Sequence, residues 1–435
     1  MNFKNRIKNI DINTLEALKN SWSSLLIKLI GHSAGFALSI YLGRTLGPEG
    51  LGLINLSSKI MNIFLILALF GMPSVVLKFV AIGYAKRDNV LIGNTVRKGL
   101  IFSGSLAIIL SLIVYNFSTY ISIFIFNSYA LIIPLKVTSL IIVPQVFSRI
   151  LSSAINGIGK VWQSHLVKDT LSAVLVGILI LLSNLLELSI NVVLLAKIYL
   201  VARIFVSLIV FIYWRKLNIS STVKRSQFKE MFKMALPMVL VSSVSILNSN
   251  FDSIMIGFLG DVEQVGFYNV ALRLATITSI IHIVSASALS PKIASFWADG
   301  KINEIEIMVQ RITKLLIILG VISLIIYFFF GTFFLEFWGK SFKESYVILI
   351  ILCFGQFFNL ATGATGLILI MTGLEKIASY ISITALCVNI ILNIIFIPLY
   401  GAIGAALVTS ITFFIENIIK YLFVLKKRSI SSIKF

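Results

Sequence analysis

Residues 52–60 read GLINLSSKI and residues 266–274 read GFYNVALRL. The two stretches place a glycine, an asparagine and a basic residue at the same spacing, 214 positions apart (266−52, 269−55 and 273−59). A second pair of stretches, GIGK at 157–160 and GLEK at 373–376, repeats at a nearly equal offset of 216. Self-similarity at a fixed offset indicates an internal repeat. Each copy of this repeat carries a cation inside an apolar segment.

The composition around these stretches predicts an all-α integral membrane protein. The chain has 435 residues, of which 58% are hydrophobic and 12% are charged, and its mean hydropathy is +1.01. A soluble domain of this length has too little interior for that much apolar surface. Apolar runs of about 20 residues, the length that crosses a bilayer as a helix, recur along the chain. We predict about twelve spans, at roughly 21–43, 52–81, 99–117, 130–152, 163–184, 190–213, 236–259, 264–290, 312–334, 346–371, 377–397 and 402–424.

The basic residues predict the orientation of these spans. Taken alternately, one set of connections holds nearly all the Lys and Arg, whereas the other set holds only Arg44, Lys340 and Lys343. The positive-inside rule then places both termini in the cytoplasm. The net charge of +20 is spread over short loops, which favours contact with anionic lipid over binding of nucleic acid.

The repeat offset predicts the domain organisation. It covers six spans, an even number, so the two halves have the same orientation and form a parallel repeat. We expect an N-terminal six-helix half at 1–213, a basic cytoplasmic linker at 214–235 and a C-terminal six-helix half at 236–435. This layout is typical of alternating-access transporters, with a central cavity between the halves.

Basic residues within the predicted spans are the candidates for a binding site. A Lys or Arg at the middle of a bilayer costs about 2.5–3.5 kcal/mol even on the mildest scale, so such residues usually face a cavity. The candidate lining of a cationic, substrate-binding cavity is Lys28, Lys59, Lys136, Lys197, Arg203 and Arg273. Lys28 and Lys136 fit equally well with snorkelling to the membrane surface. For Lys59, Arg203 and Arg273 the cavity is the favoured interpretation.

Few acidic residues accompany these cations. Asp252 lies in a predicted span, and a carboxylate there is expected either to form an ion pair with Arg273 or to carry a coupling ion such as a proton. Glu416 and Lys420, spaced i and i+4 in the last span, are expected to pair locally.

Several chemistries have no support in the sequence. No glycine-rich nucleotide-binding loop and no Cys/His cluster with metal spacing occurs, so we expect neither a cofactor nor a metal site. The predicted outer connections are short and offer no room for an active site, so we expect that the protein is not an enzyme.

Five motifs resemble those of a known family. They are GRTLGPEGLG at 43–52, DSIMIG at 252–257, VGFYN at 265–269, VNIILN at 388–393 and PLYGAIGAA at 398–406. In order and spacing they are similar to the polysaccharide (O-antigen, capsule and teichoic acid) flippases of the multidrug/oligosaccharidyl-lipid/polysaccharide exporter superfamily. The resemblance covers nearly the whole chain.

This resemblance implies a function and its partners. The substrate would be an undecaprenyl-diphosphate-linked oligosaccharide, moved across the cytoplasmic membrane for surface polysaccharide or lipopolysaccharide biosynthesis. Membrane lipids, a polysaccharide polymerase and a chain-length regulator would be the partners. The alternatives are a multidrug cation antiporter of the same superfamily, for which the excess of cations is unfavourable, and an integral-membrane polysaccharide polymerase or ligase, which would need a larger outer loop.

Overall fold

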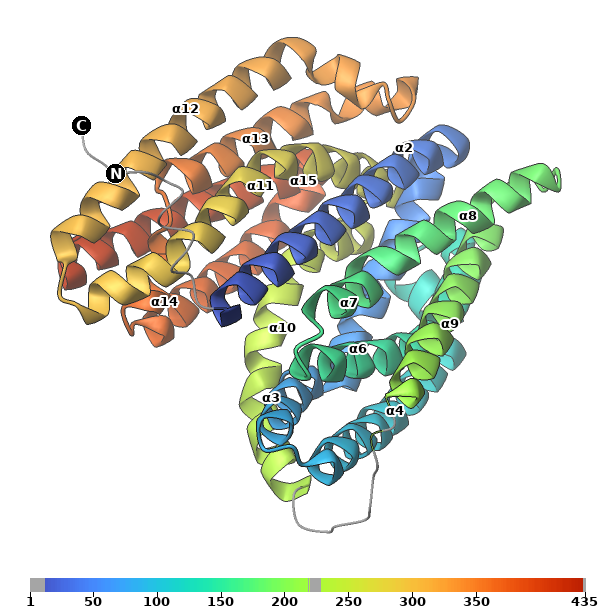
Figure 1. The fold of residues 1–435 in the computed structure, drawn as a ribbon. Coiled ribbons are helices and arrows are strands. Elements are labelled where there is room, and N and C mark those ends of the chain that lie inside the picture. Colours follow the sequence, from blue (N-terminus) through green and yellow to red (C-terminus); the bar gives the residue numbers. More distant parts are fainter. Residues whose placement is uncertain (1–11, 218, 220–227, 433–435) are drawn as a thin grey trace. The chain divides into compact units, whose positions relative to one another are not determined.

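The computed structural model describes residues 12–217, 219 and 228–432. Much of the predicted linker, at 218 and 220–227, lies outside the described residues. The described secondary structure is helical throughout, which confirms the predicted fold class (Figure 1). The α-helices are α2 (Ile12–Leu69), α3 (Met72–Ala85), α4 (Asn89–Tyr120), α5 (Ile132–Ser139), α6 (Ile142–Gly157), α7 (Val161–His165), α8 (Leu171–Leu185), α9 (Val192–Lys216), α10 (Phe228–Leu259), α11 (Val262–Ala298), α12 (Ile302–Leu335), α13 (Tyr346–Ala361), α14 (Thr365–Met371) and α15 (Glu375–Arg428).

The longest helices each contain more than one span. Within the described residues, six helices are long and apolar enough to cross a membrane, or up to eight if each of two bent pairs counts as one span. A helix rises 1.5 Å per residue, so the 54 residues of α15 far exceed a bilayer core of about 30 Å. This helix is broken at Gly401, where φ is 58°, and α2 is broken at Gly47, where φ is 67°. Glycine adopts this left-handed conformation without a steric penalty, so each break divides one long helix into two arms.

The chain forms two compact units. Unit 1 comprises residues 1–41, 60–122 and 129–243, and unit 2 comprises 42–59, 123–128 and 244–435. This division departs from the predicted halves at 42–59 and 123–128, which pack with unit 2, and at 236–243, which pack with unit 1. The predicted halves concern the sequence repeat, and their boundaries stay a prediction.

Each unit has its own apolar interior. In unit 1, α6 packs against α3, α4 and α9 around buried side chains such as Val76 and Ile150. In unit 2, α13 packs against α11, α12 and α15. Many large apolar side chains remain exposed, including Ile101 and Ile108 on α4 and Ile318 on α12. Exposed apolar surface of this extent matches the hydrocarbon of a membrane rather than water.

The repeat reappears in the packing of unit 2. A Cβ added at Gly52 would lie 2.0 Å from the carbonyl oxygen of Val262, and one added at Gly266 would lie 2.1 Å from the carbonyl oxygen of Pro48. The contact is reciprocal, because both pairs obey the same offset (262−48 = 266−52 = 214). The second arm of α2 and the start of α11 therefore cross backbone to backbone, at equivalent positions of the two copies.

Candidate functional site

A buried carboxylate in unit 2 accepts hydrogen bonds from several polar side chains. The Asp252 side chain, on α10, is 9% exposed and accepts three hydrogen bonds. Its Oδ2 accepts from the Tyr268 hydroxyl at 2.9 Å and from the Thr409 hydroxyl at 2.9 Å, and its Oδ1 accepts from Asn393 Nδ2 at 2.9 Å. Tyr268 lies on α11, whereas Asn393 and Thr409 lie on either side of the Gly401 break in α15. Because of the break, both arms of α15 contribute a hydrogen-bond donor to the carboxylate.

This cluster contains more acceptor oxygens than protons to share. The Thr409 hydroxyl lies 2.9 Å from Asp252 Oδ2 and 2.8 Å from the carbonyl oxygen of Ala405, yet it has a single proton to donate. Asn393 Nδ2 donates both to Asp252 and to Asn389 Oδ1. The buried Asn393 Oδ1 has no hydrogen-bond partner among the described residues. Such a surplus of oxygen atoms suits an added proton or a small hard cation.

One of the predicted basic residues, Lys59, lies near this carboxylate. The ammonium group of Lys59, on the second arm of α2, donates to the Ser249 carbonyl oxygen at 3.0 Å, and Ser249 lies about one helical turn before Asp252. Lys59 also interacts electrostatically with Arg273 and with Asp252. Lys59 is half-buried and Arg273 is exposed. The structure thus brings together the two cations that occupy equivalent positions of the repeat.

The other predicted cations belong to unit 1. Lys28, Lys136 and Arg203 are half-buried there, and Lys197 is exposed. The Lys136 ammonium group lies 5.8 Å from the centre of the Tyr115 ring, at a distance that allows a cation–π contact. That all six basic residues line one cavity stays a prediction.

The partners of Asp252 are the residues that sequence reasoning missed. The sequence suggested an ion pair with Arg273 or a coupling ion, and it did not indicate the neutral side chains of Tyr268, Asn393 and Thr409 that donate hydrogen bonds to Asp252. The i, i+4 spacing of Asn389 and Asn393 was a usable signal, because it placed two amides on one face of a helix. Nothing in the sequence pattern pointed to Thr409. Whether Asp252 serves ion coupling stays a prediction.

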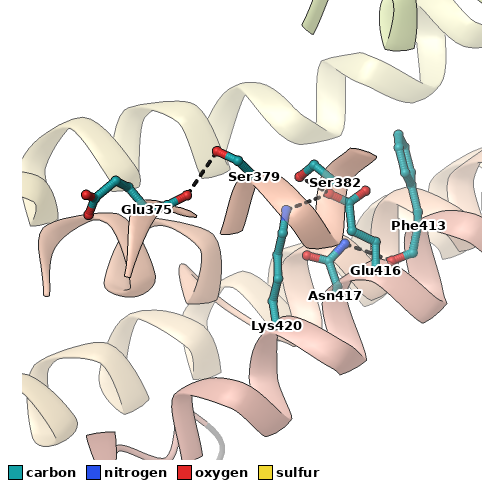
Figure 2. A network of polar contacts seen from close by, with 7 residues as sticks. All are labelled: Glu375, Ser379, Ser382, Phe413, Glu416, Asn417 and Lys420. Carbon is teal, nitrogen blue, oxygen red and sulfur yellow. Dashed lines mark hydrogen bonds and ion pairs between the residues drawn. The ribbon is translucent and has the colours of Figure 1, made fainter. Parts of the chain in front are cut away.

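The predicted pair of Glu416 and Lys420 is confirmed. Lys420 Nζ lies 2.6 Å from Glu416 Oε1, and the two side chains are 15% and 10% exposed. Figure 2 shows that Ser382, from the first arm of α15, donates to the same carboxylate oxygen, at 2.7 Å. The ion pair lies within the second arm of α15, and the Ser382 hydrogen bond joins it to the first arm.

Comparison with solved structures first identifies the fold class of the protein. The fold is that of polytopic membrane transporters. It matches a solved structure of the lipid II flippase MurJ in an inward closed conformation with a TM-score of 0.75 and 18% identity, over 94% of this chain and 87% of that one. It also matches an inward-facing multidrug resistance MATE family transporter of the MOP superfamily with a TM-score of 0.75 and 16% identity, over 94% and 98% of the two chains.

The sequence then gives the family. The model of the family described as polysaccharide biosynthesis protein matches residues 17–297, so the chain belongs to this family. A second family model, MatE, matches residues 234–395. The capsular polysaccharide biosynthesis protein CapF of Staphylococcus aureus is 29% identical over 46% of this chain and 50% of its own. The probable low-salt glycan biosynthesis flippase Agl15 of Haloferax volcanii is 23% identical over 51% and 48% of the two chains. The matched part thus spans about half the length of these relatives.

Proposed function

We propose that this protein is a flippase that moves undecaprenyl-diphosphate-linked oligosaccharide across the bacterial cytoplasmic membrane by alternating access. The observation that carries the proposal is that Lys59 and Arg273, which occupy equivalent positions of the repeat, belong to one unit and interact electrostatically. Two like charges within apolar helices repel each other, so an anionic ligand that lies between them lowers the free energy of the site. A diphosphate has the charge and the acceptor oxygens for this role.

The family and the relatives support this substrate class. CapF is named for capsular polysaccharide biosynthesis, and Agl15 is named a probable glycan biosynthesis flippase. The protein would act as a transporter rather than an enzyme, alongside a polymerase and a chain-length regulator. Both termini would lie in the cytoplasm, because the positive-inside rule assigns the basic connections to that side.

Substitution of the paired cations tests the proposal. Lys59→Ala and Arg273→Ala should each lower polymer export by at least about tenfold at unchanged membrane abundance, because a hydrogen bond to a charged group contributes about 1.5–3 kcal/mol. Lys59→Arg and Arg273→Lys should be milder, since they keep the charge and change only the geometry. Lys86→Ala, which removes an exposed cation elsewhere, is the matched control. Full export by a variant that lacks both cations would refute the proposal.

Asp252 supplies a second element of the proposed mechanism. In alternating access, a coupling ion must bind in a buried place that changes between states. The surplus of oxygen atoms around Asp252 supports a proton or a small cation there. Transport by reconstituted vesicles under an imposed proton or sodium gradient distinguishes the two ions.

A multidrug antiporter is the second candidate, because the MatE model matches residues 234–395. Such a protein would export cationic compounds and would therefore need acidic groups in its path. The nearby cations Lys59 and Arg273 disfavour this alternative. Uptake of a cationic dye into inverted vesicles is the direct measurement, and dye transport that survives loss of both cations would favour the antiporter.

A further inference from the structure

A cavity in unit 1 is lined by residues that take no part in the proposed transport site. It has a volume of about 750 Å³, within the range typical of ligand pockets. The cavity lies at the start of α4 and the end of α9, and α6 packs against both of these helices. The lining includes Arg97 of α4, Arg215 of α9 and Phe147 of α6.

The walls of this cavity combine positive charge with apolar surface. Among the described residues that line it there are two arginines and no acid. Ile101 and Phe211, also in the lining, are 61% and 43% exposed and continue the apolar outer faces of α4 and α9. Trp214 lines the cavity as well and is 9% exposed. Tryptophan at the end of a membrane helix is typical of the level of the lipid headgroups.

We propose that this cavity binds an anionic membrane phospholipid, with its phosphate on Arg97 and Arg215 and its acyl chains along Ile101 and Phe211. Guanidinium groups bind phosphate through paired, charge-assisted hydrogen bonds. Both arginines lie at the end of unit 1 that the charge distribution assigns to the cytoplasmic side, where anionic lipid is enriched. The proposal concerns unit 1 only and does not depend on the transported substrate.

Native mass spectrometry of the purified full-length protein in detergent tests this site. The probes are dioleoyl phosphatidylglycerol, dioleoyl phosphatidylcholine and soluble glycerol 3-phosphate. The wild-type protein should bind phosphatidylglycerol more tightly than the other two. The double variant Arg97→Gln/Arg215→Gln should bind phosphatidylglycerol about 25-fold more weakly, at about fivefold for each basic residue.

The control is the double variant Lys86→Gln/Arg87→Gln. It removes the same charge from exposed residues of the turn before α4, outside the cavity lining, and it should leave the affinity unchanged. Arg215→Lys should retain more affinity than Arg215→Gln, since it keeps the charge. Thermal unfolding of each variant verifies that it is folded, which the exposure of both arginines leads us to expect.

Four results would overturn the proposal. Equal affinity for phosphatidylcholine would show that the charge is not recognised, and equal affinity for glycerol 3-phosphate would show a site for soluble phosphate. An unchanged affinity in the arginine variant, or an equal loss in the control, would show that the cavity does not hold the lipid. Each of these is measured without transport, so the outcome is separate from that of the proposed function.

Discussion

The reciprocal contact between Gly52 and Gly266 predicts what a single added methyl group does. A Cβ at position 266 would lie 2.1 Å from the Pro48 carbonyl oxygen, and one at position 52 would lie 2.0 Å from that of Val262. Real Cβ contacts essentially never fall below 3.0 Å. The second arm of α2 and the start of α11 must therefore separate by at least 0.9 Å for Gly266→Ala (3.0−2.1) and by at least 1.0 Å for Gly52→Ala (3.0−2.0).

The cost of this separation sets the expected size of the effect. Because the opposing atoms belong to the backbone, they cannot rotate away, and overpacking of this kind costs about 1–3 kcal/mol. If these two helices are separated in another state of the transport cycle, the clash does not destabilise that state. Its population relative to the state with the helices in contact then rises by about 5- to 150-fold. The double variant should show less than the sum of the two effects, because one displacement relieves both clashes.

A cysteine placed at the contact reports this change. Val262 is 5% exposed, so Val262→Cys should react slowly with a maleimide reagent in the otherwise unchanged protein, in a background without the two native cysteines. Gly266→Ala should accelerate the reaction by about 5- to 150-fold. Gly35→Ala is the matched control, because a Cβ there meets no atom within 4 Å. An unchanged reaction rate together with an unchanged melting temperature in Gly266→Ala would refute the close contact.

Three further predictions concern the polar groups of unit 2. Asp252→Asn should abolish gradient-driven transport at normal membrane abundance if the carboxylate carries a coupling ion, whereas partial recovery on adding Arg273→Gln would identify an ion pair. Thr409→Val removes one donor from Asp252 and should lower the free energy of unfolding by about 1–3 kcal/mol, measured by chemical denaturation in detergent. Glu416→Gln should cost about 3–5 kcal/mol by the same measurement, because Lys420 keeps a buried charge, and adding Lys420→Met should recover much of the loss.

The sequence predicted the helices well because their signal is local. Each apolar run is long enough to identify a span by itself, as on α4 and α12, whose bounds extend past the predicted runs at both ends. The extension has a physical reason: helices continue beyond the hydrocarbon into the headgroup region, where polar residues are tolerated. Asp88 illustrates this, since its side chain accepts from Leu91 N at 2.8 Å and caps α4 outside the apolar run.

The polar network around Asp252 could not be predicted in the same way. Its partners Asn393 and Thr409 lie 141 and 157 residues further along the chain, so no periodicity within one helix connects them. Sequence reasoning offered an ion pair with Arg273 or a coupling ion, because these are the simplest ways to hold a carboxylate in a membrane. Three neutral donors achieve the same end, and their convergence depends on how α15 bends at Gly401.

The repeat connects the close backbone contact with the two cations. Lys59 follows Gly52 by seven residues, and Arg273 follows Gly266 by seven. Seven residues are about two helical turns, so each cation lies on the same helix face as its glycine, about 10 Å along the axis. Contact at the glycines therefore holds two like charges near each other, and their repulsion opposes the contact. We infer that a bound diphosphate offsets this repulsion and stabilises the contact between the second arm of α2 and α11. Its release then favours separation of these two helices. The substrate itself would thus take part in driving the change of state.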